Sequence, residues 1–325
     1  MISFSGIDIS TIFVQIVILY ILALIGFGST KSGLLPENAS VVLSKFVMRI
    51  SMPCTILSKM ISSDFTKEDY LNGIKLYFIA IVFLTITFFI SCGATKAIKP
   101  GDAVSNVYKM QSMFGNVIFF AFPLFTALFG DVGVVYALFF NMGNDTFLWT
   151  IGVWLANKHK GGNFLQNAKH LVNVNTIAFV TGVIVMLSGL NTYLQGSFIS
   201  EIFSSIGATT SPLSMIFIGM VLAGVKIKEF AGKKNLVSLA ALSLQKLLLL
   251  PLISIGILLL FKDFLGEATI IIAVMQLSMP VGTLTVSLAA EYESDYKFAA
   301  AGVMFTTILS IITMPLVVWV LKCFY

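Results

Sequence analysis

Charged residues are scarce in this chain. Only 11% of its 325 residues are Asp, Glu, Lys or Arg, whereas 58% are hydrophobic, and the mean hydropathy is +0.97. This composition excludes an ordinary soluble domain and is typical of a protein that crosses a membrane several times. In such a protein the basic residues behind the net charge of +5 report orientation in the bilayer, so they do not indicate a nucleic-acid partner.

Cysteine and histidine are also rare, with three and two residues. Cys54, Cys92 and Cys323 lie in or beside apolar segments at unrelated spacings, so they indicate neither a disulfide framework nor a metal site. The sequence contains no phosphate-binding glycine loop, zinc motif or nucleophile elbow. We therefore expect no catalytic residues, no enzyme activity, no cofactor and no metal, and an ATP-driven pump would need a motor on a separate subunit.

Long apolar runs are abundant. Ten segments are each long enough to cross a hydrocarbon core of about 30 Å, which takes roughly 20 helical residues. If the N-terminus is outside, twelve lysines fall on the inner side and five on the outer side. The positive-inside rule then predicts a multi-pass protein of the cytoplasmic (cell) membrane with both termini extracytoplasmic. The predicted spans are 10–28, 40–60, 72–95, 108–129, 132–156, 169–189, 198–224, 236–261, 266–289 and 297–322.

One proline pattern occurs twice. Pro53 and Pro123 lie 70 residues apart in apolar segments, and Pro212 and Pro280 lie 68 residues apart. With five spans in each copy, the second copy enters the membrane from the opposite side, so the repeat is inverted. We predict an all-α polytopic membrane protein of ten transmembrane helices in two inverted five-helix repeats. The predicted boundaries are 1–157 for the first repeat, 158–168 for a cytoplasmic linker and 169–325 for the second repeat.

Polar groups at membrane depth precede the later proline of each pair. Proline removes a backbone donor, which lipid tolerates only where the freed groups line a cavity or are buried in protein. Interruptions in matching positions of two halves point to a transporter's substrate site. The alternative is that the two prolines merely kink ordinary helices whose side chains satisfy the backbone locally. The predicted substrate-binding residues are Gly115, Asn116 and Pro123 in the first copy and Gln276, Ser278 and Pro280 in the second.

Several short motifs stand at or near the prolines and in the last two spans. They are Ser51-Met52-Pro53, Phe114-Gly115-Asn116, Pro123-Leu124, Leu128-Phe129-Gly130, Met279-Pro280, Leu288-Ala289-Ala290-Glu291-Tyr292, Asp295 and Met314-Pro315-Leu316. They resemble motifs in the second helix, the fourth helix and the last two helices of the auxin efflux carrier family. Phe120 departs from that family's pattern, because bacterial relatives usually have a small residue there, and this bears on packing near the interruption.

The resemblance implies a ten-helix fold related to the bile-acid/sodium symporters, in which helices 4 and 9 are broken and cross each other. It implies a scaffold, approximately 1–62 plus 169–226, and a mobile transport core, approximately 70–157 plus 234–325. It also implies a homodimer through the scaffold helices, although the residues alone leave the oligomeric state open.

Asp145 lies about a dozen residues from either end of its predicted span. A carboxylate at that depth is costly and marks a functional site by default. Asn141 shares its helix face, and Asn144 adjoins it. These three residues are the predicted ion-coupling group, which would bind H⁺ or Na⁺. The alternative is an acid with a structural role, hydrogen-bonded to neighbouring helices.

Lys246 is the basic residue nearest the centre of a predicted span. It is a candidate for pairing with Asp145 or for attracting an anionic substrate, and the alternative is a side chain that extends to the membrane surface. Lys45 and Arg49 lie one helical turn apart near the inner end of the second span, where interfacial anchors are the favoured interpretation.

Together these features predict a secondary active transporter of a small organic anion that works by an elevator-like movement of its core. The resemblance implies a dicarboxylate or an indole or aromatic acid as substrate. Two other classes stay open, namely a passive channel or facilitator and a non-transporting membrane sensor. The expected partners are the organic anion and the lipid bilayer.

Overall fold

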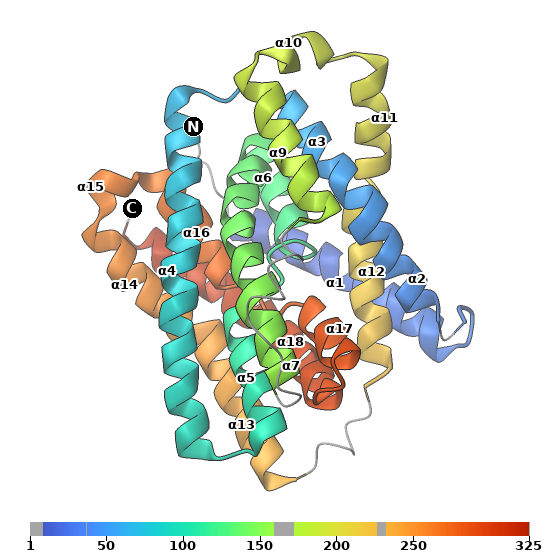
Figure 1. The fold of residues 1–325 in the computed structure, drawn as a ribbon, viewed down its shortest axis with the longest axis vertical. Coiled ribbons are helices and arrows are strands. Elements are labelled where there is room, and N and C mark those ends of the chain that lie inside the picture. Colours follow the sequence, from blue (N-terminus) through green and yellow to red (C-terminus); the bar gives the residue numbers. More distant parts are fainter. Residues whose placement is uncertain (1–8, 37, 159–171, 226–231, 325) are drawn as a thin grey trace.

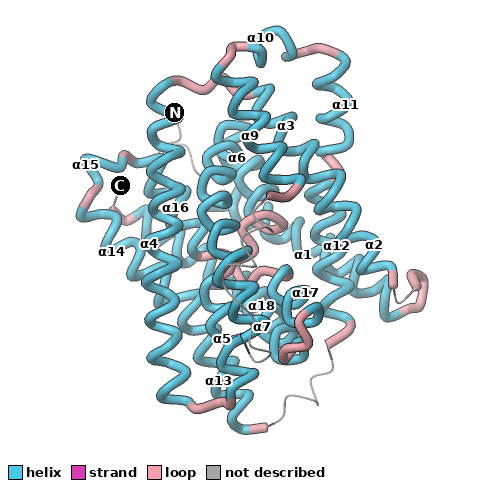
Figure 2. The backbone as a smooth tube through the Cα atoms, viewed as in Figure 1, coloured by secondary structure: helices cyan, strands magenta, loops and turns pink. Residues whose placement is uncertain are grey.

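The computed structural model describes residues 9–36, 38–158, 172–225 and 232–324, and within these ranges it contains helices and no strands (Figures 1 and 2). Apart from Lys158, the predicted linker 158–168 lies outside the described residues. The helices are α1 Ile9–Lys31, α2 Ala39–Phe46, α3 Met52–Ser62, α4 Lys67–Ile98, α5 Asp102–Met113, α6 Ala121–Phe147, α7 Val153–Asn157, α9 Val174–Leu187, α10 Leu190–Leu194, α11 Phe198–Gly207, α12 Thr210–Ala223, α13 Lys233–Leu244, α14 Leu250–Leu260, α15 Lys262–Leu265, α16 Glu267–Leu277, α17 Leu284–Glu291 and α18 Tyr296–Lys322.

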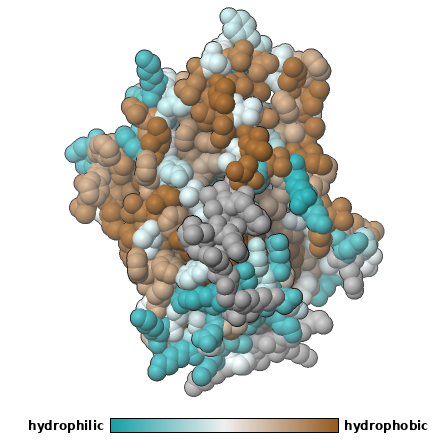
Figure 3. Space-filling view, viewed as in Figure 1, coloured by the Kyte–Doolittle hydropathy of each residue, from teal (hydrophilic) through white to brown (hydrophobic). Residues whose placement is uncertain are grey.

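Seven helical stretches in the described ranges are long and apolar enough to cross a membrane, as expected of a polytopic membrane protein. The surface in Figure 3 is mainly hydrophobic over its upper and middle parts, while hydrophilic residues gather at its lower end. The other three predicted spans are not continuous long helices. Segments 108–129 and 266–289 are interrupted, and α9 has 14 residues. The seven stretches are Phe13–Lys31, Ala39–Ser62, Lys67–Ile98, Ala121–Asn157, Phe198–Ala223, Lys234–Leu260 and Tyr296–Lys322.

Not every proline interrupts its helix. A π-helical turn at Val47–Ser51 precedes Pro53, and a second one at Gln245–Leu249 precedes Pro251. Proline cannot donate to the helical ladder and its ring collides with the carbonyl one turn earlier. The wider π turn changes the register of the ladder ahead of the proline, and both helices therefore continue across it.

Helices α1 and α12 approach each other closely enough for their backbones to touch. A Cβ atom on Gly26 would lie 2.0 Å from the carbonyl oxygen of Ile216, and one on Gly219 would lie 1.8 Å from that of Ala23. Both distances are far below van der Waals contact, so any side chain at either glycine would push the helices apart. Small residues allow the same close packing in membrane helix pairs generally.

Helix α3 and the π turn before it contact α11 and the start of α12 through polar groups. The Thr55 hydroxyl donates to the Gly207 carbonyl at 3.0 Å and lies 2.8 Å from the Thr210 hydroxyl oxygen. The Ser51 and Thr209 hydroxyl oxygens are also 2.8 Å apart. We call α1–α3 with α9–α12 the first helix group.

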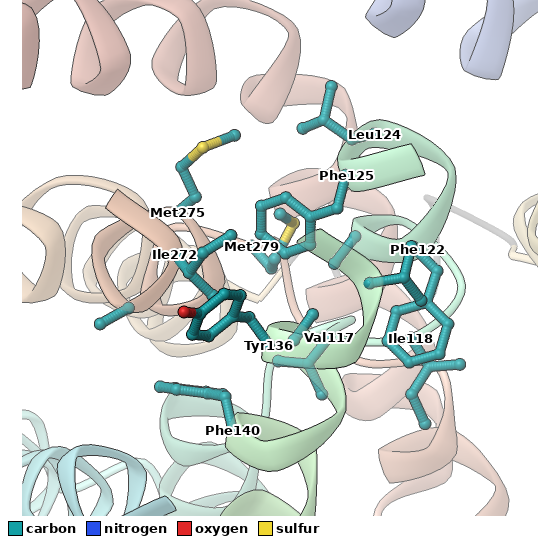
Figure 4. Packing of buried hydrophobic residues seen from close by; sticks show 14 of the residues in the cluster. Val117, Ile118, Phe122, Leu124, Phe125, Tyr136, Phe140, Ile272, Met275 and Met279 are labelled. Atoms are coloured by element: carbon teal, nitrogen blue, oxygen red, sulfur yellow. The ribbon is translucent and has the colours of Figure 1, made fainter. Parts of the chain in front are cut away.

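The remaining helices, α4–α7 and α13–α18, form a second helix group. Helix α4 packs along α6, where a Cβ on Gly143 would lie 2.6 Å from the Tyr77 carbonyl oxygen. Between α6 and α16, apolar side chains fill the interior, and Figure 4 shows Phe125, Tyr136 and Met279 among them. This packing leaves little room for polar groups, so those that are buried here have to find partners within the protein.

An ion pair joins α3 of the first group to α6 of the second. The Lys59 ammonium of α3 donates to the Asp131 carboxylate of α6 at 2.6 Å, and the Ser62 hydroxyl donates to the other carboxylate oxygen at 2.6 Å. Asp131 follows Gly130, whose φ of 64° and ψ of −155° break the helical geometry within α6. The break lies between the predicted fourth and fifth spans, 108–129 and 132–156.

Substituting Gly26 by Ala should destabilise the protein, because the new methyl group would meet the Ile216 backbone. Overpacking of this kind costs about 1–3 kcal/mol. Gly28→Ala on the same helix is a matched control, since nothing lies within 4 Å of its new Cβ. We expect a lower midpoint of thermal unfolding in detergent for Gly26→Ala and an unchanged or higher one for Gly28→Ala. Equal midpoints for the two variants would contradict the close contact of α1 with α12.

Candidate substrate site at two interrupted helices

The first interruption separates α5 from α6. Helix α5 ends at Met113, and the chain does not return to α-helical structure until Ala121. The Asn116 side-chain oxygen accepts a hydrogen bond from the Phe119 backbone N–H at 3.1 Å, which gives a freed donor a local partner. Asn116 is therefore part of the cause of the turn, and its side-chain N–H₂ group is left for other partners.

The second interruption separates α16, which ends at Leu277, from α17, which begins at Leu284. Pro280 lies inside it and has no N–H to donate. The Val281 N–H donates to the Thr306 hydroxyl oxygen of α18 at 3.1 Å. Side chains from α18 thus satisfy part of the backbone that the helix ladder has released.

The two interruptions lie against each other and satisfy each other's backbone. The Asn116 N–H donates to the Pro280 carbonyl at 2.6 Å, and the Gly282 N–H donates to the Phe114 carbonyl at 3.0 Å, as in one rung of an antiparallel sheet. A Cβ on Gly282 would lie 2.7 Å from the Gly115 carbonyl oxygen, so glycine is required for this approach. Each interrupted segment thus supplies hydrogen-bond partners for buried backbone groups of the other that have no partner in a helix.

A small cavity of about 20 Å³ lies beside this contact, and we call it the crossover cavity. Two of its polar atoms, the side-chain nitrogen of Asn116 and the hydroxyl of Thr283, are buried and have no hydrogen-bond partner among the described residues. Buried donors of this kind call for a ligand or water. The lining residues are Phe114–Phe119, Asn144, Asp145, Leu148 and Gly282–Thr285.

Asp145 brings a carboxyl group to the wall of the crossover cavity. Its residue is 7% exposed, and it accepts a hydrogen bond from the Asn141 side chain at 3.2 Å. Asn141 and Asp145 therefore share one helix face, as predicted, and their side chains are in direct contact. The side-chain oxygen of Asn141 has no partner among the described residues.

Lys246 lies beside Gly115, where a Cβ would be 3.3 Å from its ammonium nitrogen. Its ammonium is carried by the π turn ahead of Pro251, is 1% exposed and donates to the Met113 carbonyl at 3.3 Å. That carbonyl belongs to the last turn of α5, where the helix dipole favours a positive charge. Among the described residues no ion pair joins Lys246 to Asp145 within 4.0 Å, so the charge pairing considered from the sequence is not formed.

A family model described as membrane transport protein matches this chain at residues 11–168 and 163–318. The chain belongs to this family, the auxin efflux carrier family. An uncharacterized transporter of Methanocaldococcus jannaschii is 24% identical to it over 94% of this chain and 97% of that protein. An uncharacterized transporter of Methanothermobacter thermautotrophicus is 26% identical over 91% and 94%.

Membership of this transport family points to a transporter rather than an enzyme. The predicted site residues of this family member fall into two sets. Gly115, Asn116, Asn144 and Asp145 line the crossover cavity, Asn141 adjoins it through Asp145, and Pro280 supplies the backbone carbonyl opposite Asn116.

Three predicted residues lie away from the crossover cavity. The Gln276 side chain donates to the Ala137 carbonyl at 3.4 Å, and the Ser278 hydroxyl donates to the Val274 carbonyl at 2.6 Å. Pro123 is the third residue of α6, where a missing N–H leaves no bond broken, and it lines a separate cavity. The first interruption therefore centres on Gly115 and Asn116, several residues before the proline.

Phe120 also lies outside the crossover cavity. It is buried, and its ring packs edge-on against Tyr20 of α1 with centroids 6.2 Å apart. The large side chain that departs from the family pattern therefore fills the boundary with the first helix group and leaves the cavity width to other residues.

Sequence reasoning missed Thr283 and Thr285, which line the crossover cavity from the second interruption. The available signal was their place just after Pro280 and Gly282, in the segment that has to leave the helix. The sequence analysis selected Gln276 and Ser278 instead, which precede Pro280 in the chain. Gln276 lies in the last turn of α16 and Ser278 follows it, and both side chains donate hydrogen bonds to backbone carbonyls of the protein.

Gly282→Ala tests the backbone contact. The methyl group would press on the Gly115 carbonyl, separate the two interruptions and displace the cavity-lining donors. A displacement of about 1 Å at a functional site can reduce activity 100-fold. We expect purified Gly282→Ala to lose at least about tenfold in transport rate in proteoliposomes, while Gly256→Ala, with nothing within 4 Å of its Cβ, retains it. An unchanged rate for Gly282→Ala would show that the contact does not support transport.

Proposed function

We propose that this protein is a secondary active transporter of a small organic anion, either a dicarboxylate or an indole or aromatic acid. One observation carries the proposal: the crossover cavity holds two buried donors without partners, the Asn116 amide and the Thr283 hydroxyl. A carboxylate accepts hydrogen bonds from both kinds of group. Because the chain belongs to a transport family, we take the molecule that binds at this site to be the transported substrate.

Asp145 supports coupling to protons. A substrate carboxylate and an ionised Asp145 in one buried cavity repel each other, because the low dielectric strengthens like-charge repulsion. Substrate and proton are therefore expected to bind together. Sodium is the alternative coupling ion, and its ligands would be the carboxylate and the amide oxygen of Asn141, which lacks a partner among the described residues.

An elevator-like movement of the second helix group against the first is our proposed mechanism. It is supported by a difference in packing. Backbone contact of α1 with α12 holds the first group together, whereas two cavities lie on its boundary with the second group. One cavity reaches Thr283, and the other is lined by Lys59, whose ammonium pairs with Asp131.

The inverted-repeat organisation is also part of the proposal. It is supported by the paired interruptions, which lie against each other. We retain ten spans, a cytoplasmic linker at 158–168, both termini outside the cytoplasmic membrane and a homodimer through the scaffold helices as parts of this proposal. The residue ranges of scaffold and core follow the sequence-based boundaries.

Uptake and binding measurements test the proposed substrate class. Purified protein in proteoliposomes should take up and exchange at least one of radiolabelled malonate, malate and indole-3-acetate with saturation. Asn116→Ala removes one of the two unpartnered donors, so the KM for that anion should rise about tenfold, in line with about 1–3 kcal/mol for a lost buried hydrogen bond. No saturable uptake of the three anions would overturn the proposal, and a passive channel would show uptake without counterflow. Asn116→Ala with unaltered affinity would remove Asn116 from the binding site.

Asp145→Asn tests the coupling ion. The amide imitates a carboxyl group that keeps its proton, so a pH gradient should no longer drive accumulation while exchange of labelled for unlabelled substrate continues. Asp263→Asn, at an exposed acid of α15, should retain pH-driven accumulation. Accumulation that depends on a sodium gradient would assign the site to Na⁺. Full pH-driven uptake by Asp145→Asn would exclude Asp145 as the proton site.

A further inference from the structure

A second, larger cavity of about 630 Å³ lies on the boundary between the two helix groups. Its walls come from α2 and the following π turn, the start of α9, the second half of α12 and helix α17. Thr283 and Leu284 line both this cavity and the crossover cavity, so these residues form a wall between the two spaces. We call the larger space the vestibule.

Charged residues line the vestibule. Lys45 and Arg49 line it from the first helix group, Glu291 lines it from the end of α17, and all three are exposed. None of the three forms an ion pair within 4.0 Å among the described residues. With two cations and one carboxylate, the described lining of the vestibule carries a net positive charge.

The identity of the second cation is informative. Arg49 is the one arginine in a chain with 19 lysines. Membrane anchoring needs only a positive charge on a flexible stem, which lysine supplies. A planar guanidinium instead binds a carboxylate through two parallel hydrogen bonds. Its place in the wall of a cavity next to the crossover cavity favours recognition of an anion over anchoring.

The wall between the two cavities offers a donor to a carboxylate that moves inward. The Thr283 hydroxyl is buried there without a partner among the described residues, and the unpartnered Asn116 amide lies further in. Donors thus change from charged at the entrance to neutral at the crossover. A carboxylate that moved inward would exchange strong electrostatic attraction for hydrogen bonds and would not be trapped at the cations.

We propose that the vestibule is a second anion-binding site, in which Lys45 and Arg49 bind the carboxylate of the substrate before it reaches the crossover cavity. Glu291 opposes them and weakens binding at this site. Lys45 and Arg49 are therefore specificity-determining residues that select carboxylates at the entrance. This inference rests on the proposed function, since it takes the substrate to be an organic anion.

The experiment compares binding and transport by charge variants. The probes are radiolabelled malonate, malate and indole-3-acetate, measured by equilibrium binding to the full-length protein in detergent and by exchange in proteoliposomes. Lys45→Gln/Arg49→Gln should raise both the Kd and the KM at least about tenfold, and Glu291→Gln should lower them. Lys45→Arg/Arg49→Lys keeps the charge and should stay within about threefold of the unaltered protein. Lys31→Gln removes a cation at the end of α1 that does not line the vestibule, so it is the matched control.

The dependence of binding on salt concentration distinguishes anion recognition by Lys45 and Arg49 from membrane anchoring. Between 20 and 300 mM choline chloride (test concentrations), screening should weaken binding by the unaltered protein, and Lys45→Gln/Arg49→Gln should lose most of that dependence. A double variant with unchanged Kd, KM and salt dependence would overturn the vestibule site. Reduced amounts of folded protein in the membrane with unchanged Kd would assign the two residues to anchoring and would also overturn it. If the unaltered protein neither binds nor exchanges any probe, the proposed function itself fails, and that outcome is distinct from both.

Discussion

The absence of water in the bilayer interior is the constraint on which this structure depends. A backbone that leaves its helix there must have every freed N–H and C=O group satisfied by protein. Two helices do so at the same place, and each supplies what the other lacks: Asn116 donates to Pro280 and Gly282 donates to Phe114. Neither irregular segment would be acceptable alone in lipid. Their contact is therefore a condition of the fold as well as the framework of the crossover cavity.

The glycines and the buried lysine follow from that contact. Gly282 has no side chain because the Gly115 backbone lies against it, and a Cβ on Gly115 would press on the Lys246 and Met279 side chains. Lys246 places a positive charge against the carbonyl end of α5. An unpaired ammonium in the interior is costly, and here its energy is lowered by a helix terminus instead of a carboxylate. Asp145 is thus left without a cation within ion-pair distance among the described residues, which keeps it available to a proton or a metal cation.

Much of this arrangement is predictable from the sequence. Hydropathy locates the membrane helices, and the unusual pairing of polar residues with proline at membrane depth locates the interruptions. Asn116 and Asp145 could be selected because a polar side chain in lipid needs a reason. Choosing Gln276 and Ser278 instead of Thr283 and Thr285 required knowing whether the residues before or after Pro280 line the cavity. That choice is decided by packing against α18 and the first interruption, and no local pattern reports such distant contacts.

The prolines show the same limit. Pro53 and Pro251 follow π turns and leave their helices continuous, while Pro123 sits harmlessly in the first turn of α6. Of the four prolines in the repeated pattern, Pro280 is the one inside an interruption. Lys45 and Arg49 could not be assigned to the vestibule from the sequence either, because its other walls come from helices more than a hundred residues away.

The glycine contact of α1 with α12 also determines where the molecule can deform. The backbones of α1 and α12 interlock at Gly26 and Gly219. Neither helix can slide along the other unless the two first move apart, so this seam is stiff. The boundary beside the vestibule is lined by side chains and empty space, which can rearrange by rotamer changes with small energy differences. The stiff seam therefore lies within the first helix group, and the compliant seam lies at its boundary with the second group. The compliant seam contains the charges that would meet an entering anion.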